Sequence, residues 1–418
     1  EVIRAIYDTS VLDTAAGETL ASLRDGIADL PEAGQRRLVA SNYRKGTPAN
    51  ALAMLQLAAD GLLAKPVRKA AFHGLKQWEA AIETDPVLGH YRPQVVKEGR
   101  AFATLAPVLG DELRKFLSAS GDPELTTLAM EFATSAKIEL DPATLLAQAG
   151  NAKLTPGLRV AVIESLVASK PEGTRERITS LLSDEAVPVR AAAMKAAFAL
   201  GLDGIAARAT TAINEAPLPV ARAAIAGIAG TDPEAIVKLW NERSKNLRPG
   251  LWLDAYLALV EKGRPEAAAH AASDPNAVFL LSLQGGDAAA GEIVFKNQGA
   301  CLQCHKVGGE GGDKGGVQGP DLRDVAKRLS REKILESVAN PGAEIAPGYG
   351  MTTVTLKNNE SVIGRLAKET PEEVTVIGLD NSERRIARAE IASVAPPVSA
   401  MPPVAAALPP RDFRDLVA

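Results

Sequence analysis

Two cysteines and a histidine stand together in Cys301-Leu302-Gln303-Cys304-His305, and this 418-residue chain contains no other cysteine. The chain also has only four histidines. Chance would place two cysteines three positions apart, with a histidine directly after them, on the order of once in 20,000 such sequences. This motif is therefore the most specific feature of the sequence.

The spacing of the motif suits covalent attachment of a haem. Two thiols separated by two residues can reach the two vinyl groups of one porphyrin, and the imidazole of the next residue can lie over the iron. The motif predicts one haem c, attached at Cys301 and Cys304 and bound through the ring of His305.

Two other interpretations of the motif stay open. A zinc site needs four ligands, and no second cysteine pair exists, while His73, His90 and His270 lie far upstream. A redox-active dithiol would not require His305, and it usually begins a helix that follows a strand.

The residues before the motif predict a helix. In Gly286–Phe295, Asp287 can cap the helix, and Gly291 and Phe295 lie one turn apart on one face. A glycine on that face allows another helix to approach closely.

The residues after the motif predict a supporting loop. A glycine-rich stretch from Gly308 to Gly319 leads to Pro320-Asp321-Leu322. An axial imidazole needs an acceptor for its second ring nitrogen, which fixes the orientation of the ring. We expect the carbonyl of Pro320 to be that acceptor.

From about Gly285 onward the chain resembles class I cytochrome c. More narrowly, it is similar to the haem-binding domain that planctomycetes and verrucomicrobia attach to HEAT repeats in predicted membrane-bound dehydrogenases. The resemblance covers roughly a third of the chain. It depends on Gly286–Phe295, Cys301–His305, Gly319-Pro320-Asp321-Leu322, the helix Ser330–Val338, and Ser399-Ala400-Met401-Pro402.

The resemblance implies that a methionine sulfur completes the iron coordination, and only Met351 and Met401 follow His305. Met401 precedes Pro402 in an irregular, proline-rich stretch, as the resemblance implies for an axial methionine. Met351 begins a predicted strand, where it shares a face with Thr353 and not with the apolar residue Val354. We expect Met401 to be the sixth ligand, with Met351 as the alternative.

A small antiparallel β insertion is predicted over about residues 350–395. Apolar residues alternate with other residues along several short segments, as in strands. Asn358-Asn359 and Asp380-Asn381 mark turns between these segments. The insertion could shield a haem edge, form a docking face, or be a structural insert. After it, the resemblance implies a terminal helix that packs on the first one, with Phe413 and Leu416 meeting Gly291 and Phe295.

The first two-thirds of the chain predict a HEAT-like α-solenoid. Prolines recur about every 30 residues, an interval that suits two helices per repeat, and apolar helical segments follow many of them. Proline is tolerated at a helix start because its missing N–H would have no partner there. The recurring prolines are Pro66, Pro93, Pro123, Pro156, Pro188, Pro219 and Pro249.

The predicted fold class is therefore mostly α: a HEAT-like solenoid over residues 1–283, then a monohaem cytochrome c domain over 284–418. The solenoid could be a rigid spacer, or its surface could bind a protein partner.

The composition of the chain excludes some classes of function. Hydrophobic residues make up 46% of the chain and aromatic residues 4%, which suits closely packed helices. The net charge is −4 with both signs mixed, so we expect no nucleic-acid partner, and no apolar run is long enough for a membrane span.

The sequence begins at Glu1 without a signal peptide. Because haem c is attached outside the cytoplasm in bacteria, we expect a periplasmic or extracytoplasmic protein whose signal peptide is not in this sequence.

We expect an electron carrier and not an enzyme, because no dinucleotide fingerprint or catalytic triad can be located. The resemblance implies a quinoprotein-like or sugar dehydrogenase, fused or separate, as electron donor, and a downstream acceptor. The alternatives are an open-site haem enzyme or gas sensor, which requires that Met401 not bind, and a HEAT scaffold with a minor redox role.

Overall fold

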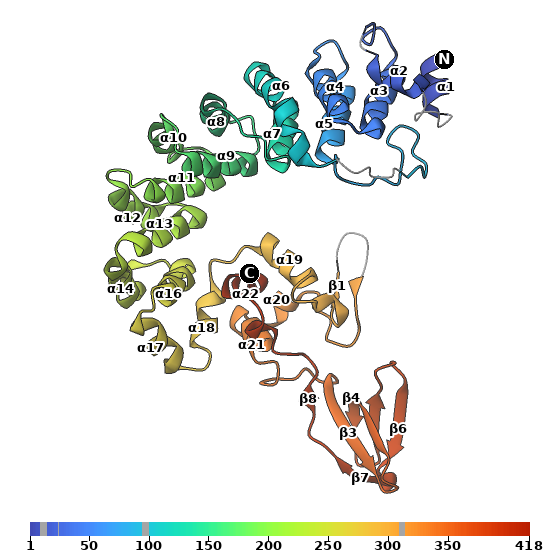
Figure 1. The fold of residues 1–418 in the computed structure, drawn as a ribbon. Helices are drawn as coiled ribbons and strands as arrows, with labels where there is room; N and C mark the ends of the chain where they lie inside the picture. Colours follow the sequence, from blue (N-terminus) through green and yellow to red (C-terminus); the bar gives the residue numbers. More distant parts are fainter. Residues whose placement is uncertain (9–14, 24, 94–99, 309–313) are drawn as a thin grey trace. The chain divides into compact units, whose positions relative to one another are not determined.

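The structure is a computed structural model that describes residues 1–8, 15–23, 25–93, 100–308 and 314–418 (Figure 1). It is mostly helical, with a small antiparallel sheet towards the C-terminus, which confirms the predicted fold class. The chain forms two compact units, Glu1–Ile205 and Ala206–Ala418. The boundary predicted between residues 283 and 284 falls inside the second unit and stays a prediction. Within the described ranges, no helix has the length and apolar character needed to cross a bilayer.

Two rows of helices make up most of the first unit. After α1 (Val2–Asp8) and α2 (Ala15–Ser22), one row packs in the order α3 (Glu32–Lys45), α5 (Lys65–Lys76), α7 (Pro123–Ser135), α9 (Pro156–Ser169) and α11 (Val187–Ala199). The other row contains α4 (Pro48–Ala59), α6 (Ala106–Ala119), α8 (Pro142–Ala149) and α10 (Thr174–Leu181). This arrangement agrees with stacked helix pairs, while their HEAT-like identity stays a prediction.

Six of the seven recurring prolines stand at helix starts. Pro66, Pro123, Pro156, Pro188 and Pro219 occupy the first or second position of an α-helix, and Pro249 begins a 3-10 turn. Side chains one residue earlier cap some of these helices, as Asp122 and Thr155 do by accepting backbone N–H groups. Pro93 stands directly before residues 94–99, which lie outside the described residues.

The second unit begins with short helices and continues into the part that carries the cysteines. The first set is α12 (Ile205–Glu215, from the unit boundary), α13 (Leu218–Thr231), α14 (Pro233–Asn241), α15 (Arg243–Asn246), η3 (Pro249–Leu251), α16 (Trp252–Glu261), α17 (Pro265–Ser273), α18 (Ala277–Leu280) and η4 (Leu281–Leu283). The second set is α19 (Ala288–Lys296), η5 (Cys301–Gln303), α20 (Val325–Arg328), α21 (Arg331–Ala339), η7 (Val404–Ala406) and α22 (Pro410–Val417).

One hydrophobic core joins these two sets. Its buried members are Val294, Leu335, Ala405, Leu408, Phe413 and Val417. Phe279 and Leu283, from the end of the first set, pack against it, and the rings of Phe279 and Phe413 lie 5.3 Å apart at 67°. The last helices before α19 therefore share their core with the cysteine-bearing part.

Gly291 allows α19 and α22 to touch through their backbones, as the sequence predicted. A Cβ built on Gly291 would lie 1.9 Å from the carbonyl oxygen of Asp415. The expected role of Phe295 was wrong in one respect: Val294, three residues from Gly291, lies in the core with Phe413, whereas Phe295 is only partly buried. Both spacings occur on one helix face, so either residue could have met α22.

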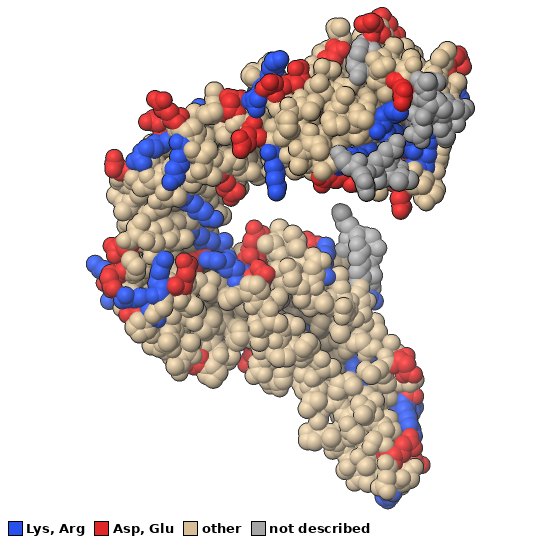
Figure 2. All heavy atoms as spheres, in the orientation of Figure 1, with Lys and Arg blue, Asp and Glu red and all other residues tan. Residues whose placement is uncertain are grey.

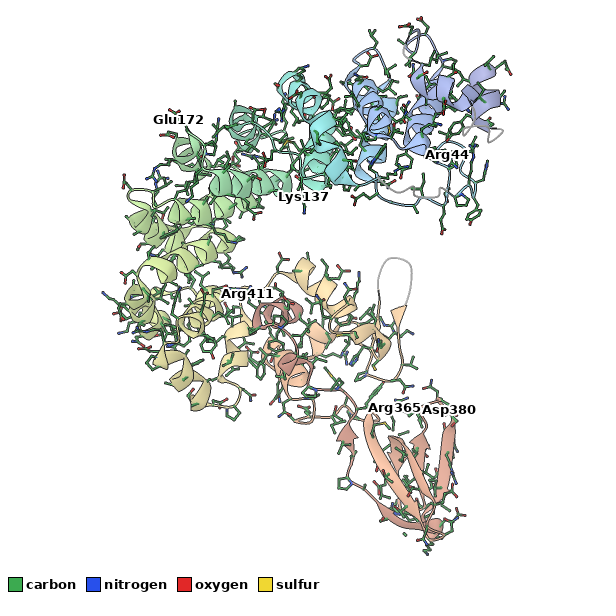
Figure 3. The ribbon with its side chains drawn as sticks, viewed as in Figure 1. Arg44, Lys137, Glu172, Arg365, Asp380 and Arg411 are labelled. Carbon is green, nitrogen blue, oxygen red and sulfur yellow. The ribbon has the colours of Figure 1, made fainter. Side chains whose placement is uncertain are left out.

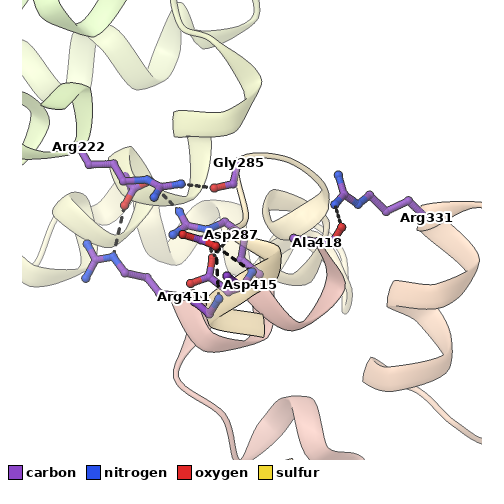
Figure 4. A network of polar contacts seen from close by, with 11 residues as sticks. Arg222, Gly285, Asp287, Arg331, Arg411, Asp415 and Ala418 are labelled. Atoms are coloured by element: carbon purple, nitrogen blue, oxygen red, sulfur yellow. Dashed lines mark hydrogen bonds and ion pairs between the residues drawn. The ribbon is translucent and has the colours of Figure 1, made fainter. Parts of the chain in front are cut away.

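A network of ion pairs fixes α22 to α13 and α16 (Figure 4). The buried carboxylate of Asp254 accepts hydrogen bonds from Arg222 at 3.1 Å, Arg414 at 2.9 Å and Arg411 at 3.3 Å. The side chains of Asp254 and Arg414 are each only 2% exposed. A buried carboxylate is tolerated because these three guanidinium groups surround it.

The end of α22 is also held. Arg331 of α21 donates to the carbonyl oxygens of Val417 at 3.2 Å and Ala418 at 2.7 Å. Cationic groups stabilise the C-terminus of a helix in this way, because its last carbonyls have no partner within the helix.

The predicted β insertion forms an antiparallel sheet in the order β6-β5-β4-β3-β7, with β8 pairing to β3. Its apolar side chains build a separate core around Val354, Leu356, Val374, Val376 and Ile386, and Asn359 and Asn381 adopt the left-handed conformation in the turns. The strands are β3 (Gly350–Leu356), β4 (Ser361–Glu369), β5 (Glu373–Ile377), β6 (Glu383–Ala387), β7 (Ile391–Val394) and β8 (Val398–Ser399).

Substituting Gly291 with alanine should destabilise the second unit, because the new methyl group would push α22 away from α19. We expect a loss of about 1–3 kcal/mol in the free energy of unfolding, measured by urea denaturation. Gly230→Ala in α13 is the matched control, since nothing lies within 4 Å of its Cβ position. Equal stability of the two variants would contradict the close helix contact.

Candidate functional site

The two cysteines and His305 lie on one tight turn. Cys301–Gln303 form the 3-10 turn η5, and the backbone N–H groups of Cys304 and His305 both donate to the carbonyl of Cys301, at 3.2 and 2.9 Å. Ala300, directly before the turn, has φ 49°, a left-handed conformation that costs a non-glycine residue about 1 kcal/mol or more. The turn therefore contains local backbone strain, which the surrounding bonds hold in place.

Both thiols are free, but their surroundings differ. Cys304 is exposed, whereas Cys301 is partly buried with its Sγ 3.5 Å from the carbonyl oxygen of Gly299. Burial raises the pKa of the Cys301 thiol above its usual value. Cys301 is therefore mainly an uncharged thiol at neutral pH, unlike a reactive cysteine whose pKa is lowered.

The imidazole of His305 is bound by the residue that the sequence indicated. Its Nδ1 lies 2.8 Å from the carbonyl oxygen of Pro320. A carbonyl only accepts hydrogen bonds, so Nδ1 carries the hydrogen and Nε2 keeps its lone pair for a metal. The contact is the one expected, and its role in holding an axial ligand stays a prediction.

Glycines bring the supporting loop against the motif. β1 (Lys306–Val307) pairs with β2 (Lys314–Gly315), and the N–H groups of Gly316 and Gly319 donate to the carbonyls of Leu302 and Cys304, at 2.8 and 2.7 Å. A Cβ on Gly319 would lie 2.7–3.0 Å from atoms of the His305 ring. The glycine-rich sequence is needed because side chains would not fit there. Residues 309–313 of this loop lie outside the described residues.

These residues fit a covalently attached haem. One turn supplies two free thiols and an imidazole whose Nε2 lone pair is available to a metal. Pro320 and Gly319 fix the plane of the imidazole ring. Within the described residues, no three His, Cys, Asp or Glu side chains form a group that could hold a metal ion directly.

The two candidate methionines lie in different settings. Met401 is partly buried between β8 and η7, and its N–H donates to the Ser399 hydroxyl at 3.2 Å. Met351 lies in β3, on the side that alternates with the buried residues Thr352, Val354 and Leu356. Its strand position agrees with the predicted alternation. The identity of the sixth ligand stays a prediction.

Residues 288–375 match the family model described as cytochrome c. The matched stretch contains α19, the Cys301–His305 motif, Pro320 and Met351, and it ends before Met401. No curated protein matches the chain. The second unit therefore contains a cytochrome c domain, which implies bound haem c and a role in electron transfer with a redox partner.

Substituting Gly319 with alanine should disturb the His305 imidazole, because the methyl group would overlap the ring. We expect the free energy of unfolding to fall by about 1–3 kcal/mol in denaturant, together with a lower yield of haem-loaded protein. Gly342→Ala, with only the Asn340 amide oxygen at 3.9 Å from its Cβ position, is the control. The contact between Gly319 and His305 would be refuted by two variants that behave alike.

Proposed function

We propose that this chain is a c-type cytochrome that transfers one electron at a time through a single covalently bound haem. The observation that carries the proposal is the turn on which Cys301, Cys304 and His305 meet, with the imidazole bound to the Pro320 carbonyl at 2.8 Å. When bound, haem c supplies an iron centre that gains and loses one electron.

The chain's residues would hold this group in a fixed setting. Thioether bonds at Cys301 and Cys304 would prevent its loss, and the Pro320 carbonyl would keep the ring of His305 in one tautomer and one plane. Met401 would provide the second axial ligand from the segment between β8 and η7. Six-coordination by fixed ligands favours electron transfer, because little has to move when the charge changes.

We propose that the chain itself is not an enzyme. A dehydrogenase, fused or separate, would donate electrons, and a second protein would accept them. The helical part would be a spacer or a docking surface for one of them. Because haem c is attached outside the cytoplasm in bacteria, we propose a periplasmic or extracytoplasmic location. The proposed partners follow from the resemblance to haem-binding domains attached to HEAT repeats.

Replacing both cysteines with alanine should abolish covalent haem retention. The protein is to be produced together with a cytochrome c maturation system, and haem is then detected on a denaturing gel. We expect strong staining in the unmodified protein, weaker staining in either single variant, and none in the double variant. Unchanged staining of the double variant would falsify covalent attachment, and a colourless unmodified protein that binds zinc would refute the whole proposal.

Met401→Ala should lower the reduction potential and allow the reduced protein to bind CO, because a thioether ligand raises the potential and closes the iron. Met351→Ala is the control and should change neither property. The opposite pattern would assign the ligand to Met351. Rapid CO binding by the unmodified protein would instead support the open-site haem enzyme or sensor.

A further inference from the structure

The loop that binds His305 owes its close fit to glycines. A Cβ on Gly315 or Gly316 would lie 2.0–2.1 Å from a carbonyl oxygen of the Cys301–His305 motif, and one on Gly319 would overlap the imidazole. Glycine fits these positions, but it gives the backbone more conformational freedom than any other residue. We therefore expect a contact from outside the loop to restrict it.

Gln318 supplies such a contact. It lies between Gly316 and Gly319, it is partly buried, and its Nε2 donates to the Leu379 carbonyl oxygen at 3.0 Å. Leu379 belongs to the turn between β5 and β6, 61 positions further along the chain. Because the Leu379 side chain is 72% exposed, the bond depends on the backbone of this turn and not on that side chain.

The β5–β6 turn is held by its own hydrogen bonds. The N–H of Gly378 donates to the Ser382 carbonyl at 2.9 Å, and that of Asn381 donates to the Gly378 carbonyl at 3.0 Å. The carboxylate of Asp380, labelled in Figure 3, accepts from the N–H of Ser382 at 2.9 Å and from its hydroxyl at 2.6 Å. These bonds fix the turn, which can therefore hold Gln318 in one place.

The bond from Gln318 joins the sheet to the loop without a charge. The exposed arginines Arg384, Arg385 and Arg388 each pair with a carboxylate of the β insertion at 2.7–2.8 Å. Figure 2 shows acidic and basic side chains interspersed along this side of the sheet. Since the Gln318 amide is neutral, its bond to the turn would act on the loop by position and not by the field of an unpaired charge.

We propose that Gln318 is a positioning residue for the iron ligand His305, and that the β insertion influences the reduction potential of the bound haem through it. This inference rests on the proposed function. Pro320, two residues after Gln318, accepts the hydrogen bond of the His305 Nδ1 at 2.8 Å. A hydrogen bond at this nitrogen makes the imidazole a more basic ligand, which stabilises the more positively charged oxidised iron. By restricting the loop, Gln318 keeps this bond in place and the potential low.

Gln318→Leu tests the contact, because leucine is uncharged and similar in volume but cannot donate to the Leu379 carbonyl. We expect the midpoint potential of the haem-loaded protein to rise, as measured by spectroelectrochemical titration. The Nδ1–H of His305 should also exchange faster with solvent, as followed by NMR of the reduced protein. Gln284→Leu makes the same change at an exposed glutamine before α19, and Leu379→Ala removes the side chain but keeps the carbonyl. Both controls should keep the potential and the exchange rate of the unmodified protein.

Two results would overturn the inference: a potential of Gln318→Leu equal to that of Gln284→Leu, or an equal rise in Leu379→Ala, which would indicate packing of the side chains alone. A structure of the unmodified haem-loaded protein tests the same contact if Gln318→Leu does not mature. A Gln318 amide beyond hydrogen-bond distance of the Leu379 carbonyl in that structure would also refute the inference. Haem staining separates these failures from failure of the proposed function, because an unstained unmodified protein would contradict haem binding itself.

Discussion

The contact of α22 with α19 is the constraint on which the rest of the cytochrome part depends. It brings together segments separated by more than a hundred residues, and it exists only because Gly291 has no side chain to meet the Asp415 carbonyl. The N–H of Asp287 also donates to the Asp415 carboxylate at 3.1 Å. The contact between α19 and α22 therefore joins the two ends of the stretch that contains the cysteine motif and Met401.

Asp254 connects α22 to the helices that precede α19. Its carboxylate binds arginines of α13 and α22, and the charge of the buried Arg414 is balanced there. Breaking a buried ion pair by removing one partner costs about 3–5 kcal/mol, because the remaining charge stays buried. Gly285 adds a steric limit, since its Cβ position lies 2.2 Å from the Gly250 carbonyl oxygen. The helices around α16 thus pack against the cytochrome part through buried contacts and help to stabilise it.

The sequence predicted those features that depend on neighbouring residues. The Asp287 cap, the strand pairs around Val354 and Val374, and the bond from His305 to Pro320 follow from local pattern and chemistry. The choice of Val294 over Phe295 in the core could not be predicted, because both positions share one helix face with Gly291 and only the packing against α22 distinguishes them. The ion pair between Asp254 and Arg414 spans 160 positions, and no local pattern indicates it.

At the candidate site, too, the sequence predicted local elements of the sheet but not its contacts with distant residues. Alternation of apolar residues predicted its strands, but not its contact with the loop that supports His305. Gln318, between the glycines that bind the motif, donates to the Leu379 carbonyl of the β5–β6 turn at 3.0 Å. A displacement of the sheet would reach the supporting loop through Gln318. Since that loop binds the His305 imidazole, the insertion and the imidazole are mechanically connected, which a purely peripheral insert would not require.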